Sequence, residues 1–184
     1  DNQELDVHLM SEELASYKGT SHTACPSVGS WLDCYEGYDE VFVITLTGSM
    51  SGTYNSAMIA KGIYEEENDN VKVHVFDSLS TGPEMRLLIE KLKEMIEEDL
   101  PFEEIVEKGQ DYLKHTRLFF ALKSLHNFAM NGRINKAVAS AIGVLNISIF
   151  ATASEEGTIQ QISKCRGEKK VVKSMIEHLE NAGY

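Results

Sequence analysis

The chain has 184 residues, of which 42% are hydrophobic and 25% charged, and its formal net charge is −12 at pH 7. This size and composition predict a globular protein made of one domain, or of one domain and part of another. The negative net charge argues against a nucleic-acid-binding surface, which needs clustered Lys and Arg. It also argues against binding to anionic membranes. No apolar run approaches the roughly 20 residues of a membrane span.

The cysteines and histidines do not have the spacing of a metal centre or a disulfide framework. Cys25, Cys34 and Cys165 are odd in number and form no CxxC pair. The six histidines are scattered, without the HxH or HExxH spacing that presents two ligands together. We therefore expect no metal ligands, no cofactor and a location in the reducing cytoplasm.

The first elements that the pattern predicts are two strands and the helix between them. Residues Val41–Leu46 form a nearly continuous apolar run, which is typical of a parallel strand covered on both faces. Residues Val71–Phe76 alternate between polar and apolar side chains, and Tyr54–Glu67 has a helical pattern. Strand, helix and strand in this order predict a βαβ unit with a parallel sheet.

Two amphipathic helices are predicted next. Pro83 is suited to the first turn of the first helix, and apolar residues follow it at spacings of three and four as far as Ile96. Pro101 opens the second, whose apolar face runs to Leu113. The acidic residues of both helices indicate a solvated face and not a cluster of catalytic carboxylates.

The pattern changes after Thr116, where shorter elements begin. We expect a strand, a short helix, a small apolar stretch, two strands and a closing helix, in the ranges Leu118–Leu122, Ser124–Met130, Ala137–Leu145, Asn146–Thr152, Thr158–Ser163 and Val171–Leu179. The predicted fold is therefore α/β, with a parallel-sheet domain in residues 1–115 and part of a second, smaller α/β domain in residues 116–184.

The turn after the first strand is the strongest candidate for a binding site. Residues Thr47–Thr53 consist of hydroxyl residues and glycines around Met50, between a strand and a helix. Such a turn directs backbone N–H groups and hydroxyls at one point beyond the carboxyl end of the strand. The helix dipole also favours negative charge there, so the turn predicts a site for an acidic small molecule.

Other interpretations of this turn remain open at this point. The hydroxyls of Thr47 and Ser51 could instead cap the helix that begins near Gly52. A nucleotide-binding P-loop is not predicted, because the turn lacks its spacing and its Gly-Lys pair. A catalytic serine is not predicted either, since the chain has no G-x-S-x-G nucleophile elbow.

Six short segments, in this order along the chain, carry a resemblance to a known family. They are Thr23–Ser27, Thr47–Thr53, Asp77–Pro83, Gly132–Ile134, Leu145–Ile147 and Lys164–Gly167. They resemble motifs of the DegV family of bacterial fatty-acid-binding proteins, such as its Thr-Ser-Gln-Pro-Ser, Ser-Ser-x-Leu-Ser-Gly-Thr and Gly-Arg-Ile segments. Because that family usually has a strand before this region and further chain after it, we expect a protein truncated at both ends.

The resemblance implies a lipid-binding protein and not an enzyme. Members of the family hold a long-chain fatty acid in a tunnel between two α/β domains and present its carboxylate to a separate, ATP-dependent fatty acid kinase. The implied carboxylate-binding residues of this chain are Thr23, Thr47, Gly48 and Ser49. A hydrogen bond from such a neutral donor to a charged group contributes about 1.5–3 kcal/mol. Gly48 replaces a family serine, so the main contact is left open between Thr47 and Gly48.

Three further residues have two interpretations each. Arg133 in the Gly-Arg-Ile turn and Arg166 before Gly167 could contact a partner or an acyl-phosphate head group, or form surface ion pairs. Cys25, which replaces a family glutamine, could be a thiol near the ligand or a packing residue. The alternative function is a small-molecule α/β enzyme that acts on a phosphorylated or carboxylated metabolite at the same turn.

Overall fold

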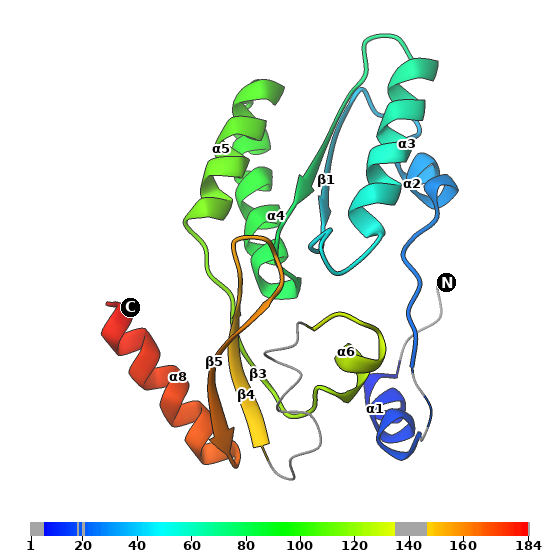
Figure 1. The fold of residues 1–184 in the computed structure, drawn as a ribbon. Coiled ribbons are helices and arrows are strands. Elements are labelled where there is room, and N and C mark those ends of the chain that lie inside the picture. Colours follow the sequence, from blue (N-terminus) through cyan, green and yellow to red (C-terminus); the bar gives the residue numbers. More distant parts are fainter. Residues whose placement is uncertain (1–5, 18, 20, 135–146, 184) are drawn as a thin grey trace.

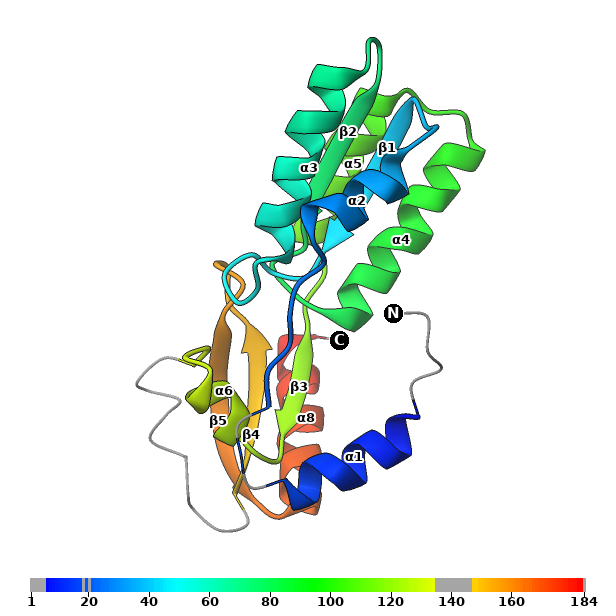
Figure 2. The same ribbon diagram turned by 90° about the vertical axis from the view of Figure 1, so that its right-hand side faces the viewer.

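The computed structural model of the protein describes residues 6–17, 19, 21–134 and 147–183. These residues form two separate β-sheets, one near each end of the molecule, with helices packed around them (Figures 1 and 2). None of the described helices combines the length and the apolar character that crossing a membrane requires.

The first sheet is the predicted βαβ unit. Strand β1 (Glu40–Thr45) pairs with β2 (Lys72–Asp77) in parallel, and the register runs from Glu40 opposite Lys72 to Thr45 opposite Asp77. Helix α3 (Thr53–Glu67) connects the two strands. The predicted parallel pairing is therefore confirmed, and the carboxyl ends of both strands meet at one edge of the sheet.

Helices cover both faces of this sheet, so the region has three layers. Helix α2 (Val28–Tyr35) and α3 lie on one face, whereas α4 (Gly82–Glu97) and α5 (Phe102–Lys114) lie on the other (Figure 1). The buried residues of the first face are Tyr35, Val43, Ala57, Ala60, Tyr64, Val73 and Val75. Those of the second face are Phe76, Leu88, Leu92, Met95 and Ile105. Burial on both faces explains the continuous apolar run of β1.

The second sheet is antiparallel and has the strand order β3-β4-β5. Its elements are β3 (Phe119–Leu122), the short helix α6 (His126–Met130), β4 (Ile147–Ala153), β5 (Ile159–Arg166) and α8 (Glu168–Ala182). Each matches an element predicted after Thr116, within a few residues at the ends. The predicted apolar stretch Ala137–Leu145, and Asn146 at the start of the predicted strand, lie outside the described residues.

Two N-terminal helices were not predicted. Helix α1 (Val7–Ser16) begins at the N-cap Asp6, whose carboxylate accepts hydrogen bonds from two backbone N–H groups of the first turn. Helix α2 begins at Ser27, whose hydroxyl accepts one from the N–H of Ser30. In both views α1 lies at the end of the molecule that holds the second sheet (Figures 1 and 2). The division into residues 1–115 and 116–184 stays a prediction, and its boundary falls between α5 and β3.

Candidate anion-binding site

Thr47 lies at the centre of the predicted site, just beyond the end of β1. Its side chain is buried, with 5% of the residue exposed, and its backbone N–H donates to the carbonyl of Ser80 at 2.9 Å. The Thr47 hydroxyl oxygen accepts a hydrogen bond from the Ser49 backbone N–H at 3.3 Å. The hydroxyl is therefore held in place by the turn itself.

The helix-capping interpretation of this turn applies to Ser51 and not to Thr47. The N-cap of α3 is Gly52, which makes no side-chain capping bond. The Ser51 hydroxyl accepts from the Thr53 N–H at 3.2 Å and lies 2.8 Å from the Thr53 hydroxyl. The Thr47 hydroxyl thus remains a candidate for ligand binding.

Asp77 is a residue of the site that the sequence marked only as the start of a family-like segment and not as a site residue. Its two carboxylate oxygens accept from the Gly48 N–H at 3.1 and 3.2 Å, and one of them also accepts from the Leu79 N–H at 3.0 Å. The Gly48 N–H, which we predicted to face the ligand, is therefore paired within the chain. The available signal was the position of Asp77 at the end of the neighbouring parallel strand.

Arg133 lies against the same turn, although 83 residues separate it from Met50. Its Nε donates to the Met50 carbonyl at 2.9 Å, and its side chain is partly buried. Met50 packs against the buried cluster of the second sheet, which consists of Leu125, Ile149, Ala151 and Ile159. A guanidinium has five N–H donors in a geometry that suits a carboxylate. The fold thus brings a cation into contact with the turn that contains Thr47.

Arg166 does not join this site. Arg166 pairs with Ile147 at one end of the β4–β5 ladder. The other end is the pair Ala153–Ile159, next to the loop that contacts Ser49 through Glu156. At about 3.3 Å per residue, the length of β5 separates Arg166 from that end by about 23 Å. The two predicted arginines therefore occupy different places, and of the two it is Arg133 that contacts the turn, through the Met50 carbonyl.

Ser49 and Ser80 complete the surroundings of Thr47. The Ser49 hydroxyl donates to the backbone carbonyl of Glu156, which lies in the tight turn between β4 and β5. The Ser80 hydroxyl is buried and has no hydrogen-bond partner within the described part of the chain. An unpaired buried hydroxyl is costly, so this position can accept a water molecule or a polar ligand group.

Thr23 belongs to an exposed, extended segment that passes close to the turn. The ring of His22 pairs with the side chain of Asn131, just after α6, at 3.0 Å. A Cβ added to Gly52 would lie 3.2 Å from the Cys25 sulfur, so the segment also runs past the start of α3. Thr23 lies between His22 and Cys25 along the chain, and its part in ligand binding stays a prediction. Its side chain is exposed.

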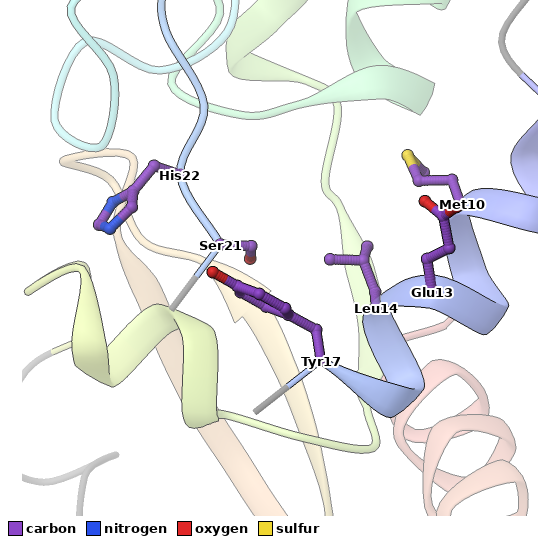
Figure 3. A pocket seen from close by; sticks show the side chains of 6 residues that line it. All are labelled: Met10, Glu13, Leu14, Tyr17, Ser21 and His22. Carbon is purple, nitrogen blue, oxygen red and sulfur yellow. The ribbon is translucent and has the colours of Figure 1, made fainter. Parts of the chain in front are cut away.

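An open pocket adjoins this segment and reaches to α1. Its volume is about 460 Å³, and it is lined by Met10, Glu13, Leu14, Tyr17, Ser21 and His22 (Figure 3). Tyr17 reaches from the end of α1 toward Ser21. A second hollow of about 450 Å³ shares Leu14, Tyr17 and Ser21 and extends to Asn127 of α6. Volumes of 300–1,000 Å³ are usual for small-molecule sites.

Comparison with known proteins gives a consistent family. The family described as "Uncharacterised protein, DegV family" matches residues 1–183. A DegV domain-containing protein of Streptococcus gordonii is 41% identical over 184 residues, which are 100% of this chain and 66% of the relative. The chain thus spans slightly less than two thirds of the length of this relative.

Solved structures give the same result. A DegV family protein from Eubacterium eligens, loaded with heptadecanoic acid, is 52% identical with a TM-score of 0.91. The Fatty Acid Kinase (Fak) B3 protein of Streptococcus pneumoniae, loaded with linoleic acid, is 42% identical with a TM-score of 0.92. Both comparisons cover 100% of this chain and 66% of the other.

Proposed function

This chain belongs to the DegV family, and from that premise we propose that it binds a long-chain fatty acid and presents the carboxylate to a separate fatty acid kinase. Two similar proteins, with TM-scores of 0.91 and 0.92, were loaded with fatty acids, and one of them is named for a fatty acid kinase. In this role the chain supplies recognition, and the partner supplies the ATP-dependent chemistry in the cytoplasm.

The observation that carries the proposal is the contact of Arg133 with the Met50 carbonyl at 2.9 Å. It brings a guanidinium to the turn that holds the Thr47 hydroxyl, in a chain whose net charge is −12. The carboxylate lies, in our proposal, between Arg133 and Thr47, with Thr23 on its exposed side. Hydrogen bonds to a charged group are worth about 1.5–3 kcal/mol each, which suffices to orient the head group.

The acyl chain needs an apolar path away from this head-group site. The pocket beside α1 offers the apolar side chains of Met10, Leu14 and Tyr17, next to the segment that carries Thr23. We place at least part of the acyl chain there, between α1 and α6. Burial of each CH₂ contributes about 0.8 kcal/mol, so the acyl chain supplies most of the affinity.

Extraction of the purified 184-residue chain with organic solvent, followed by mass spectrometry, tests the proposal directly. A released fatty acid supports it. A released phosphate ester instead supports the alternative, an α/β enzyme acting on a phosphorylated metabolite. If neither is released and added linoleic acid does not bind, the chain is a folding unit without this function.

The two arginines provide a matched pair for the head-group site. Arg133→Gln should weaken the binding of linoleic acid at least about tenfold, because a charge-assisted hydrogen bond is lost. Arg166→Gln should leave the affinity unchanged, since it removes the same charge at the far end of β5. Isothermal titration calorimetry measures both variants, and equal losses would show that only net charge matters.

A further inference from the structure

The tight turn between β4 and β5, residues Ser154–Thr158, touches the anion-binding turn from the other sheet. Ser49 donates its hydroxyl hydrogen to the Glu156 carbonyl, across 107 residues of sequence. Two internal hydrogen bonds fix the shape of this β4–β5 turn. The Ser154 N–H donates to the Thr158 carbonyl at 2.8 Å, and the Gly157 N–H donates to the Ser154 carbonyl at 2.9 Å. A defined element therefore packs against the turn, where the sequence had indicated only a hairpin.

Gly157 forms the closest part of this contact. Its φ is +73°, and a Cβ at this position would lie 2.1 Å from the Thr47 hydroxyl oxygen. The same Cβ would lie 3.0 Å from the Thr47 Cβ and from the Leu79 Cα, a backbone atom. Thr47 is buried and cannot swing aside as a long flexible side chain would. Only glycine leaves room for the Thr47 side chain as it stands.

The hydrogen bonds around the turn identify the donor that remains for a ligand. The Gly48 N–H is taken by Asp77, and the single hydrogen of the Ser49 hydroxyl is taken by Glu156. The Thr47 oxygen accepts from the Ser49 N–H, which leaves its own hydrogen to be donated elsewhere. Among the described residues that hydrogen has no acceptor.

We propose that the β4–β5 turn is a positioning element of the carboxylate site, with Gly157 as its positioning residue. Gly157 and the Glu156 carbonyl hold Thr47 and Ser49 so that the Thr47 O–H, and neither Gly48 nor Ser49, is the turn's donor to the fatty acid. The inference rests on the proposed function and deepens it, because it selects one of the alternatives that the sequence left open.

Gly157→Ala and Gly37→Ala form the matched pair that tests this role. Both substitutions put a side chain at a positive φ, +73° and +84°, but a Cβ on Gly37 has nothing within 4 Å. The backbone strain is therefore shared, whereas the collision with Thr47 is not. Gly157→Ala should bind linoleic acid at least about tenfold more weakly than Gly37→Ala, as expected for a misaligned bond to a charged group.

A second pair keeps the test decisive if Gly157→Ala does not fold. The readout is the ratio of affinities for linoleic acid and its methyl ester, which reports on the carboxylate and not on general stability. Thr47→Val should lower this ratio about tenfold or more, because it removes the donor itself. Ser49→Ala should lower the ratio less, because it removes the bond to Glu156 that helps to hold the turn but keeps the Thr47 hydroxyl. An equal or larger fall in Ser49→Ala would overturn the inference.

The outcomes also distinguish an error in the head-group site from an error in the positioning role of Gly157. If the unmutated chain binds neither acid nor ester, or binds both equally, the head-group site itself is wrong and this inference falls with it. If the unmutated chain prefers the acid but Gly157→Ala binds it as well as Gly37→Ala does, the fatty-acid site stands and only the positioning role is overturned.

Discussion

The two sides of the proposed carboxylate site are built in different ways. On one side, Thr47 is 5% exposed, and its turn is bonded to the next loop through Ser80 and Asp77. On the other side, Thr23 is exposed in an extended segment that is tied to Asn131 through His22. The buried side is organised before a ligand arrives, whereas the exposed side must lose freedom on binding, and that ordering costs affinity.

The difference follows from what each segment is attached to. The Thr47 turn continues a buried strand, so the sheet and the layers around it fix its direction. The described residues around Thr23, 21–27, precede α2 and belong to neither sheet. Attachment to the sheet edge fixes the position of the Thr47 hydroxyl. The exposed segment around Thr23 leaves the site accessible from solvent.

The largest effect should come from the same isosteric change made on both sides. Thr47→Val should weaken linoleic acid binding by about 1.5–3 kcal/mol, because it removes a fixed donor to a charged group. Thr23→Val should cost only about 0.5–1.5 kcal/mol, since water competes at an exposed hydroxyl. Calorimetric titration gives both values. An equal or larger loss in Thr23→Val would remove the distinction between the two sides.

The next effect concerns the stability of the buried side. Asp77→Ala should lower the free energy of unfolding by about 1–2 kcal/mol, because the Gly48 and Leu79 N–H groups lose their acceptor. Both N–H groups belong to exposed residues, so water limits the loss. Asp77→Asn, which keeps one amide oxygen, should lose less. Urea denaturation measures both variants, and no loss in Asp77→Ala would show that this carboxylate does not hold the turn.

A smaller effect is expected on the exposed side. Asn131→Ala should raise the amide hydrogen exchange of residues 21–25, with at most about 1 kcal/mol lost from global stability. Asn68→Ala is the control, because the Asn68 amide donates to the Tyr64 carbonyl at 3.0 Å within the first sheet's layers. Unchanged exchange in Asn131→Ala would mean that the segment has other anchors.

The smallest effect should come from Ser80, whose hydroxyl is buried without a partner among the described residues. Ser80→Ala should change the free energy of unfolding by less than about 0.5 kcal/mol. The matched change Ser78→Ala should cost about 1 kcal/mol, because the Ser78 hydroxyl accepts from the Ser80 N–H at 3.2 Å. A loss in Ser80→Ala as large as that in Ser78→Ala would reveal a water molecule at Ser80.

Elements with their own packing pattern were predictable from the sequence. The apolar run of β1, the alternation of β2 and the stripes of α4 and α5 each reflect burial that the structure confirms. Helices α1 and α2 were missed because α1 exposes most of its apolar residues and α2 has only eight residues. The capping bonds of Asp6 and Ser27 were the local signals that could have located both.

The candidate site was only partly predictable for a related reason. The turn at Thr47 is a local feature of strand, glycine and hydroxyl pattern, so the sequence pointed to it. The contacts that complete it come from Arg133 and Glu156, which are 83 and 107 residues from their partners. No periodicity encodes such contacts. The resemblance to a family suggested Arg133, whereas the sequence indicated the β4–β5 turn only as a hairpin and not as a part of this site.

This separation along the chain has a consequence for how the protein is made. The βαβ unit that carries Thr47 is complete once β2 has been synthesised, but Glu156 follows Ser49 by 107 residues. At ~5–20 residues per second, a ribosome takes about 5–20 s to cover that distance. During this interval the Glu156 carbonyl does not yet exist, so the site is completed only after the βαβ unit that carries Thr47 has been made. Changes in the β4–β5 turn should therefore accelerate unfolding more than they slow folding.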